Sequence, residues 1–130
     1  CDCILIILSA LSGKQSDEIY DEALKNKLSI IVEVHDEKEA EFALKYEESI
    51  IGINNRNLKN LQISLDNSVK IKKKLNSHKG PIISESGIKN KIDAQYIYDK
   101  TGIKNFLIGE SLLVSGKSEK LIKEILSINL

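Results

Sequence analysis

Residues 29–54, SIIVEVHDEKEAEFALKYEESIIGIN, contain the pattern that decides the fold. Two short runs rich in Ile and Val, 29–34 and 50–53, enclose a charged segment, 36–46, in which apolar residues recur at helical spacing. Short continuous apolar runs are typical of strands that are buried on both faces. Asp36 opens the middle segment with a residue that commonly caps helices. This stretch therefore predicts a strand–helix–strand unit with parallel strands.

The same order continues on both sides of this unit. Further apolar runs lie at 3–8, 81–84 and 105–108, and amphipathic segments follow at 16–25, 66–75, 90–99 and 118–126. Gly102 fits the cap position after a helix that ends near Lys100, and Gly80 with Pro81 marks the entry to the fourth strand. Regular alternation of strands and helices predicts a parallel sheet. The fold class is therefore α/β, with five βα units.

Two architectures agree with this alternation: a doubly wound sheet and a segment of a (β/α)₈ barrel. Polar residues at the ends of the strands distinguish them. A barrel gathers the carboxyl ends of its strands around one mouth, where its active sites lie. Residues suited to such a mouth lie at the carboxyl ends of four successive runs: Glu33, His35, Asp36; Asn54, Asn55, Arg56; Ser84, Glu85, Ser86; Glu110 and Ser111. We therefore predict a partial (β/α)₈ TIM barrel.

The length and the first residues predict an incomplete barrel. The 130 residues fit one domain, yet a closed barrel needs eight βα units. The chain opens on strand residues and contains no Met. We expect residues 1–130 to be the C-terminal part of a single TIM-barrel domain, corresponding to strands 4 to 8, with three units missing at the N-terminus. The first and last strands would then have unpaired edges, and inward-facing apolar residues would lack neighbours.

Composition excludes several classes of partner and location. Nineteen Lys and Arg balance nineteen Asp and Glu, so neither a nucleic acid nor an anionic membrane is expected as a partner. The longest apolar run, 4–8, is too short to cross a bilayer and does not resemble a signal peptide. Cys1 and Cys3 are poorly placed for a local disulfide, and no second Cys/His pair completes a metal site. A cytoplasmic protein without a metal is predicted.

Four segments together resemble one enzyme family. They are VEVHDEKEAEFAL at 32–44, IIGINNRNL at 50–58, IISESGI at 82–88 and FLIGESLL at 106–113. In this order they are similar to the fifth to eighth strands of indole-3-glycerol phosphate synthases. DCILIILSAL at 2–11 looks like the family's fourth strand, so the resemblance runs from Cys1 to the C-terminus.

The resemblance implies a lyase of tryptophan biosynthesis. The family closes the indole ring of 1-(2-carboxyphenylamino)-1-deoxyribulose 5-phosphate with loss of carbon dioxide and water, giving indole-3-glycerol phosphate. It uses no metal and no organic cofactor. By the resemblance, Glu33 would act as a base or an electrostatic stabiliser, and Asn54 would orient it and the substrate. A carboxylate in an apolar mouth is partly desolvated, which independently favours acid–base use.

The same resemblance indicates the residues that bind substrate. Glycines after the last two predicted strands let a phosphate approach backbone N–H groups, in the region where barrels frequently bind phosphate. We assign Ser86, Gly87, Gly109 and Glu110 to phosphate binding, Glu110 through its main chain because its carboxylate would repel the ligand. Arg56 and Glu85 would either order the mouth through an ion pair or touch substrate. His35 is expected to support its loop or to bond Asp36, without a catalytic role.

The sequence also departs from the family. The family's first strand has a Glu-x-Lys-x-x-Ser-Pro-Ser motif and its third strand has a general-acid lysine, and neither occurs in these residues. The isolated chain is therefore expected to be inactive and to need the missing N-terminal half of the barrel as a partner. Two alternatives stay open: another phosphate-binding barrel, such as a phosphoribosylanthranilate isomerase-like or thiazole-synthase-like enzyme, and a non-catalytic phosphate-binding half-barrel.

Overall fold

A single sheet of five parallel strands forms the centre of the protein, whose computed structural model describes residues 1–114 and 118–128. The strands are β1 (Cys3–Ile7), β2 (Ser29–Val34), β3 (Ile50–Asn54), β4 (Ile82–Glu85) and β5 (Asn105–Leu107). They lie side by side in chain order, and every neighbouring pair is parallel. A doubly wound sheet would reverse its order at a switch point. The α/β prediction is confirmed, and the order is that of consecutive barrel units.

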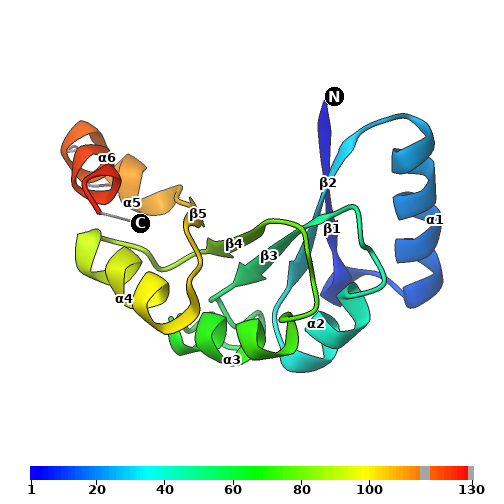
Figure 1. Cartoon of the computed structure of the whole chain (residues 1–130), viewed down its shortest axis with the longest axis horizontal. Helices are drawn as coiled ribbons and strands as arrows, with labels where there is room; N and C mark the ends of the chain where they lie inside the picture. Colours follow the sequence, from blue (N-terminus) through cyan, green and yellow to red (C-terminus); the bar gives the residue numbers. More distant parts are fainter. Residues whose placement is uncertain (115–117, 129–130) are drawn as a thin grey trace.

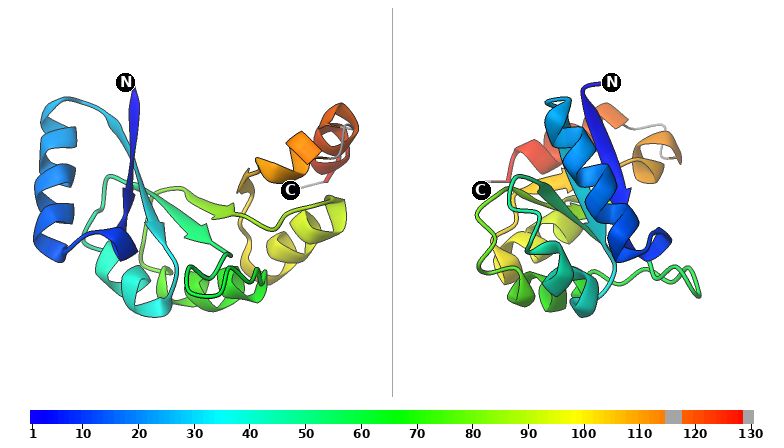
Figure 2. Two further views of the ribbon diagram at one scale, coloured as in Figure 1. Left: turned by 180° about the vertical axis from the view of Figure 1, so that it is seen from behind. Right: turned by 90° about the vertical axis from the view of Figure 1, so that its right-hand side faces the viewer.

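The α-helices between successive strands lie along the outer, convex side of the curved sheet, whereas the helices after β5 lie at a raised end of the molecule (Figures 1 and 2). The helices are η1 (Leu8–Ala10), α1 (Gly13–Lys25), α2 (Glu37–Ala43), α3 (Asp66–Lys74), α4 (Lys91–Thr101), α5 (Glu110–Val114) and α6 (Ser118–Leu126). None of the described helices is long and apolar enough to cross a membrane. The sheet resembles part of a cylinder wall with its concave side open.

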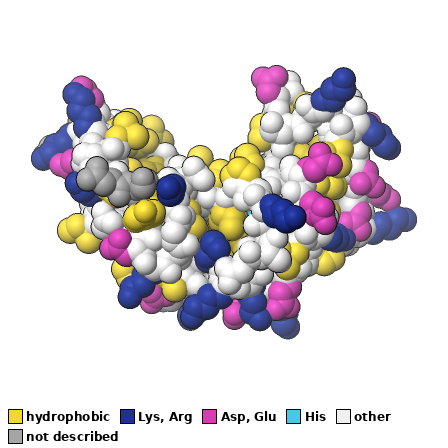
Figure 3. Space-filling model, viewed as in Figure 1, with side chains coloured by type: hydrophobic (Ala, Val, Ile, Leu, Met, Phe, Trp, Pro, Cys, Tyr) yellow, Lys and Arg dark blue, Asp and Glu magenta, His cyan; other side chains and the backbone are white. Residues whose placement is uncertain are grey.

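The main core lies between the sheet and the helices. Side chains that alternate toward the convex face are almost fully buried, including Ile6, Ile30, Val32, Val34, Ile51 and Ile53. They pack with Ile71 of α3, Leu75 at its end and Ile97 of α4. On the concave face the apolar residues stay partly open to solvent, and Leu5 and Leu107 are 50% and 57% exposed. Hydrophobic side chains are visible in the hollow between the raised ends of the molecule (Figure 3).

The ends of several helices differ from the prediction, because local side-chain contacts determine where a helix begins and ends. α1 begins at Gly13 rather than Ser16, since Ser12 and Gln15 form a reciprocal capping box. α2 ends at Ala43, and the Tyr46 hydroxyl beyond it donates to Asp17 Oδ1 at 2.7 Å. η1 and α5 were not predicted. The cap at Gly102 is confirmed, with a left-handed φ of 72°.

Candidate active site

A cleft of about 780 Å³ opens at the carboxyl ends of β2 to β5. All the residues to which the sequence assigned a role line it: Glu33, Asn54, Arg56, Glu85, Ser86, Gly87, Gly109 and Glu110. They come from segments as far apart as β2 and α5, and parallel strands bring them to one edge. Among the described residues, no group of three His, Cys, Asp or Glu side chains could hold a metal ion.

Two carboxyl groups meet across β3. Glu33 ends the inward-facing row of β2 and Glu85 is the last residue of β4, and they are 8% and 4% exposed. Gly52 lies between them on β3, in register with Glu33. A Cβ at position 52 would overlap the Glu85 carboxyl group. The missing side chain therefore allows Glu85 to lie over β3 toward Glu33.

This arrangement perturbs Glu85 strongly. Burial, followed by the neighbouring Glu33 carboxylate, raises the pKa of Glu85 to about 8. Glu85 Oε1 is buried without a hydrogen-bond partner among the described residues. At neutral pH Glu85 therefore carries a proton, and a carboxyl group that titrates near the working pH suits acid–base catalysis. From the sequence, Glu85 was assigned to an ion pair or a substrate contact rather than to acid–base chemistry. Gly52 was not singled out, although a glycine inside a strand often marks a close approach.

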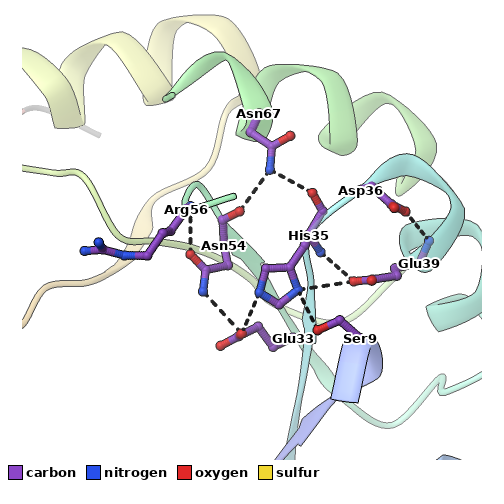
Figure 4. A network of polar contacts seen from close by, with 8 residues as sticks. All are labelled: Ser9, Glu33, His35, Asp36, Glu39, Asn54, Arg56 and Asn67. Atoms are coloured by element: carbon purple, nitrogen blue, oxygen red, sulfur yellow. Dashed lines mark hydrogen bonds and ion pairs between the residues drawn. The ribbon is translucent and has the colours of Figure 1, made fainter. Parts of the chain in front are cut away.

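Asn54 holds Glu33 from the end of β3 (Figure 4). Its Nδ2 donates to Glu33 Oε1 at 3.2 Å, and its Oδ1 accepts from the Arg56 backbone N–H at 2.9 Å. Asn67 Nδ2 in turn donates to the Asn54 carbonyl at 2.9 Å. The expected contact between Asn54 and Glu33 is present, and its catalytic role stays a prediction.

Arg56 forms an ion pair across the mouth of the cleft. Its Nη2 donates to Glu110 Oε2 at 3.0 Å, which joins the end of β3 to the start of α5. The ion pair was one of the two roles expected for Arg56. A second cation, Lys89, lines the same cleft on the segment after β4 and was not singled out from the sequence. Its position directly after the SESGI motif was the available signal.

The end of the cleft near β4 and β5 is formed by tight turns. Ser86 and Gly87 both adopt positive φ angles, of 65° and 83°, so the chain turns sharply after β4. Ile63 packs where a side chain at Gly87 would lie. A Cβ at Gly109 would meet nothing within 4 Å. Ser111 Oγ donates to the Ile88 carbonyl at 2.8 Å and ties the two turns together.

Of the two contacts expected for His35, the bond to Asp36 is absent, whereas its ring contacts Glu39 in the segment that follows β2. Asp36 instead caps α2, where its Oδ1 accepts from the Glu39 backbone N–H at 2.9 Å. The His35 ring turns the other way and lies between Glu33 and Glu39. Asp36 caps the helix rather than bonding His35 because it directly precedes the first turn, whose N–H groups lack partners within the helix.

Comparisons with known proteins identify the family. Residues 1–125 match the family model for indole-3-glycerol phosphate synthase. Curated enzymes of that name from Bacillus thuringiensis (strain Al Hakam), Bacillus mycoides (strain KBAB4) and Bacillus cereus (strain AH187) are 45%, 44% and 43% identical over 114 residues. These matches cover 88% of this chain and 45% of each relative, so the chain spans about half the length of the curated relatives it matches.

Solved structures share the fold. Thiamine phosphate pyrophosphorylase from Pyrococcus furiosus has a TM-score of 0.69 at 20% identity, covering 97% of this chain and 58% of that one. The YdjI aldolase from Escherichia coli K12 has a TM-score of 0.58 at 15% identity, covering 86% and 45%. At these identities the likeness concerns the fold alone. The family model, which spans nearly the whole chain, and the Bacillus relatives show that the chain belongs to the indole-3-glycerol phosphate synthase family.

Proposed function

We propose that this chain supplies the C-terminal half of an indole-3-glycerol phosphate synthase active site, a carboxy-lyase site of tryptophan biosynthesis. The substrate would be 1-(2-carboxyphenylamino)-1-deoxyribulose 5-phosphate, which loses carbon dioxide and water as the indole ring closes. The single observation that carries the proposal is the buried Glu33–Glu85 pair at the base of the cleft. Ring closure and dehydration both need proton transfers, and two carboxyl groups in different protonation states suit them.

The two carboxyl groups would divide the work. Glu85 carries a proton at neutral pH and is placed to donate it or a hydrogen bond. Glu33, held by Asn54, would accept a proton or stabilise positive charge that develops on the substrate nitrogen during ring closure. Asn54 would orient both Glu33 and the substrate. No metal and no organic cofactor enters this scheme.

The phosphate would bind at the opposite end of the cleft, against the backbone of Ser86, Gly87 and Gly109. Positive φ angles at the first two and open space at the third support this assignment. Short helix α5 begins at Glu110, beside a place where barrels frequently bind phosphate. The Glu110 side chain is paired with Arg56, which leaves its main chain for the ligand. Lys89 adds a positive charge to the same end.

The remaining barrel units are the partner we propose. The free edge of β1 and the bare concave face support a packing partner, and the chain covers 45% of its Bacillus thuringiensis relative. By resemblance to the family, that partner would bring the lysines that are absent here. Neither a nucleic acid nor a membrane is part of the proposal. Cys1 and Cys3 are free thiols, which suits a reducing cytoplasm.

Complementation tests the proposed function. The purified chain would be assayed alone and after mixing with an N-terminal fragment of the Bacillus thuringiensis relative that covers the unmatched part. We expect no indole-3-glycerol phosphate above a protein-free control from the chain alone, and formation of product by the mixture. A mixture that binds inorganic phosphate but never forms product would favour the non-catalytic half-barrel instead.

Two variants separate chemistry from phosphate binding in the same mixture. Glu33→Gln keeps the size of the side chain but removes its charge, so kcat should fall about 10²-fold or more while KM changes little. Gly109→Val should raise KM and leave kcat nearly unchanged, because a branched side chain fits the fold but blocks the phosphate. Near-normal kcat for Glu33→Gln, or normal substrate binding by Gly109→Val, would contradict the corresponding assignment.

A further inference from the structure

His35 lies behind the cleft rather than in it. Its side chain is 8% exposed, and each ring nitrogen faces a carboxylate (Figure 4). Nε2 is 3.0 Å from Glu33 Oε1, and Nδ1 is 3.3 Å from Glu39 Oε2. Ser9 Oγ from η1 lies 3.4 Å from Nδ1. The ring therefore connects the candidate catalytic carboxylate on β2 with a second carboxylate on α2.

Only a charged ring is attracted to both carboxylates. A neutral imidazole has one N–H and one lone pair, so one of the two carboxylates would face a lone pair. An imidazolium presents an N–H on each side and places its positive charge between them. Nε2 is not aligned for a direct hydrogen bond, so its contact with Glu33 at 3.0 Å depends on charge.

The surroundings of the ring favour the same state. Glu33 from β2 and Glu39 from α2 are the titratable groups that face it, and η1 contributes the neutral Ser9. From α3, Asn67 Nδ2 donates to the His35 carbonyl at 3.1 Å and fixes the backbone. Glu39 Oε2 also accepts from the His35 backbone N–H at 2.7 Å. Two anions and no contacting cation among the described residues surround the ring.

We propose that His35 is a positioning residue for Glu33: as an imidazolium between Glu33 and Glu39 it keeps Glu33 ionised, and so leaves the proton of the carboxyl pair on Glu85. The charge arrangement stands on this geometry, while its consequence for catalysis rests on the proposed function. His35 touches no reacting atom. It acts through Glu33 and decides which of two adjacent carboxyl groups accepts protons.

The two carboxyl groups have unequal environments, which supports this division. Glu33 Oε1 receives the Asn54 amide and the His35 ring, whereas Glu85 Oε1 is buried without a partner in the described part of the chain. Adjacent carboxyl groups share protons according to which anion is better stabilised. Burial raises the pKa of Glu85, in agreement with a proton that rests there.

Carbon-13 NMR of the glutamate carboxyl groups tests the proposal in this chain without any activity. His35→Gln removes the ring charge and keeps a donor, and Ser9→Ala serves as the matched control because it removes only the uncharged contact. In His35→Gln the Glu33 anion loses its neighbouring positive charge, so the pair should share its proton: part of the Glu85 signal change should move to lower pH, and the rest should stay near pH 8. The Glu33 signal should begin to move in the same pH range. Ser9→Ala should titrate as the wild type does.

A second pair of variants keeps the test valid if His35→Gln fails to fold. His35→Asn keeps an amide near Nδ1, and Glu39→Gln leaves the ring in place but removes the anion that helps to hold its charge. Both should shift the titration in the same direction, Glu39→Gln by less. Wild-type titration of Glu33 and Glu85 in whichever of these variants retain the native backbone spectrum would overturn the proposal.

The complemented enzyme adds a kinetic readout. His35→Gln should lower kcat about tenfold, keep KM within about twofold and shift the pH profile of kcat. Ser9→Ala should keep the wild-type profile. A wild-type mixture without activity would refute the proposed function but leave the NMR result standing. An active mixture in which His35→Gln keeps the wild-type pH profile would refute the role of His35.

Discussion

Gly52 determines how closely the two carboxyl groups of the cleft approach each other. In Gly52→Ala the new methyl group would occupy the place of the Glu85 carboxyl, which must then turn away from Glu33. We expect the pKa of Glu85 to fall toward its ordinary value of 4.5, because both burial and the neighbouring charge decrease. Carboxyl NMR measures this shift. Gly109→Ala is the control, since a Cβ at that position meets nothing.

Glu85 should also make stability depend on pH. Its pKa is about 8 in the folded protein and near 4.5 in an unfolded chain. Between these values only the folded state holds the proton, so the free energy of unfolding decreases as pH rises from about 4.5 to 8. Glu85→Gln should flatten this decrease in urea titrations at several pH values. An equally steep dependence in Glu85→Gln, judged against Glu47→Gln on the exposed surface, would contradict the assignment.

Site residues are predictable from sequence to the extent that their backbone positions are. Glu33 and Asn54 end strands with clear apolar patterns, so their meeting at one edge follows from the topology. Glu85 lies at the end of its strand for the same reason. Its raised pKa, however, depends on the space that Gly52 leaves, and this effect is visible only once the register of β3 and β4 is known. For His35 the sequence left two contacts open, and the capping of α2 by Asp36, which decides between them, depends on local backbone geometry.

At the scale of elements, Gly102 ends α4 in a left-handed conformation that would strain any residue type with a side chain. Its φ of 72° is left-handed, and a Cβ there would meet no atom within 4 Å. Gly102→Ala should therefore lower the free energy of unfolding by about 1 kcal/mol through backbone strain alone. Chemical denaturation measures this, with Lys100→Ala in the same turn as the control. If Gly102→Ala lowers the free energy of unfolding no more than Lys100→Ala does, the end of α4 relaxes without strain.

Strands were predicted more accurately than helix ends. The run at 29–34 matches β2 residue for residue, because alternation of buried faces leaves few other positions for Ile and Val. Helix α1 gained its first turn from the Ser12–Gln15 capping box, a side-chain arrangement that the apolar pattern does not contain. α5 has five residues, fewer than two helical turns, so periodicity had too little length to reveal it.

At the scale of the whole molecule, the concave face should make the isolated chain associate. Leu5 on β1 and Leu107 on β5 are both at least half exposed on that face, and each belongs to an edge strand. We expect concentration-dependent association in sedimentation velocity, reduced by Leu107→Lys. Ile92→Lys, on the outer surface of α4 where Ile92 is 78% exposed, is the control and should leave association unchanged. A monodisperse wild-type monomer would count against an incomplete barrel.

The main core lies outside the curve of the sheet, between strands and helices, and this has a consequence for the order of folding. Ile6, Val32 and Ile53 reach full burial without any residue on the concave side. The hydrophobic free energy of this layer therefore does not depend on closure of a barrel. Closure would bury a second layer around Leu5, Ile31 and Ile83. Unfolding of an assembled barrel should then proceed in two stages. The barrel interior should open at a lower denaturant concentration than the one at which the sheet–helix layer unfolds.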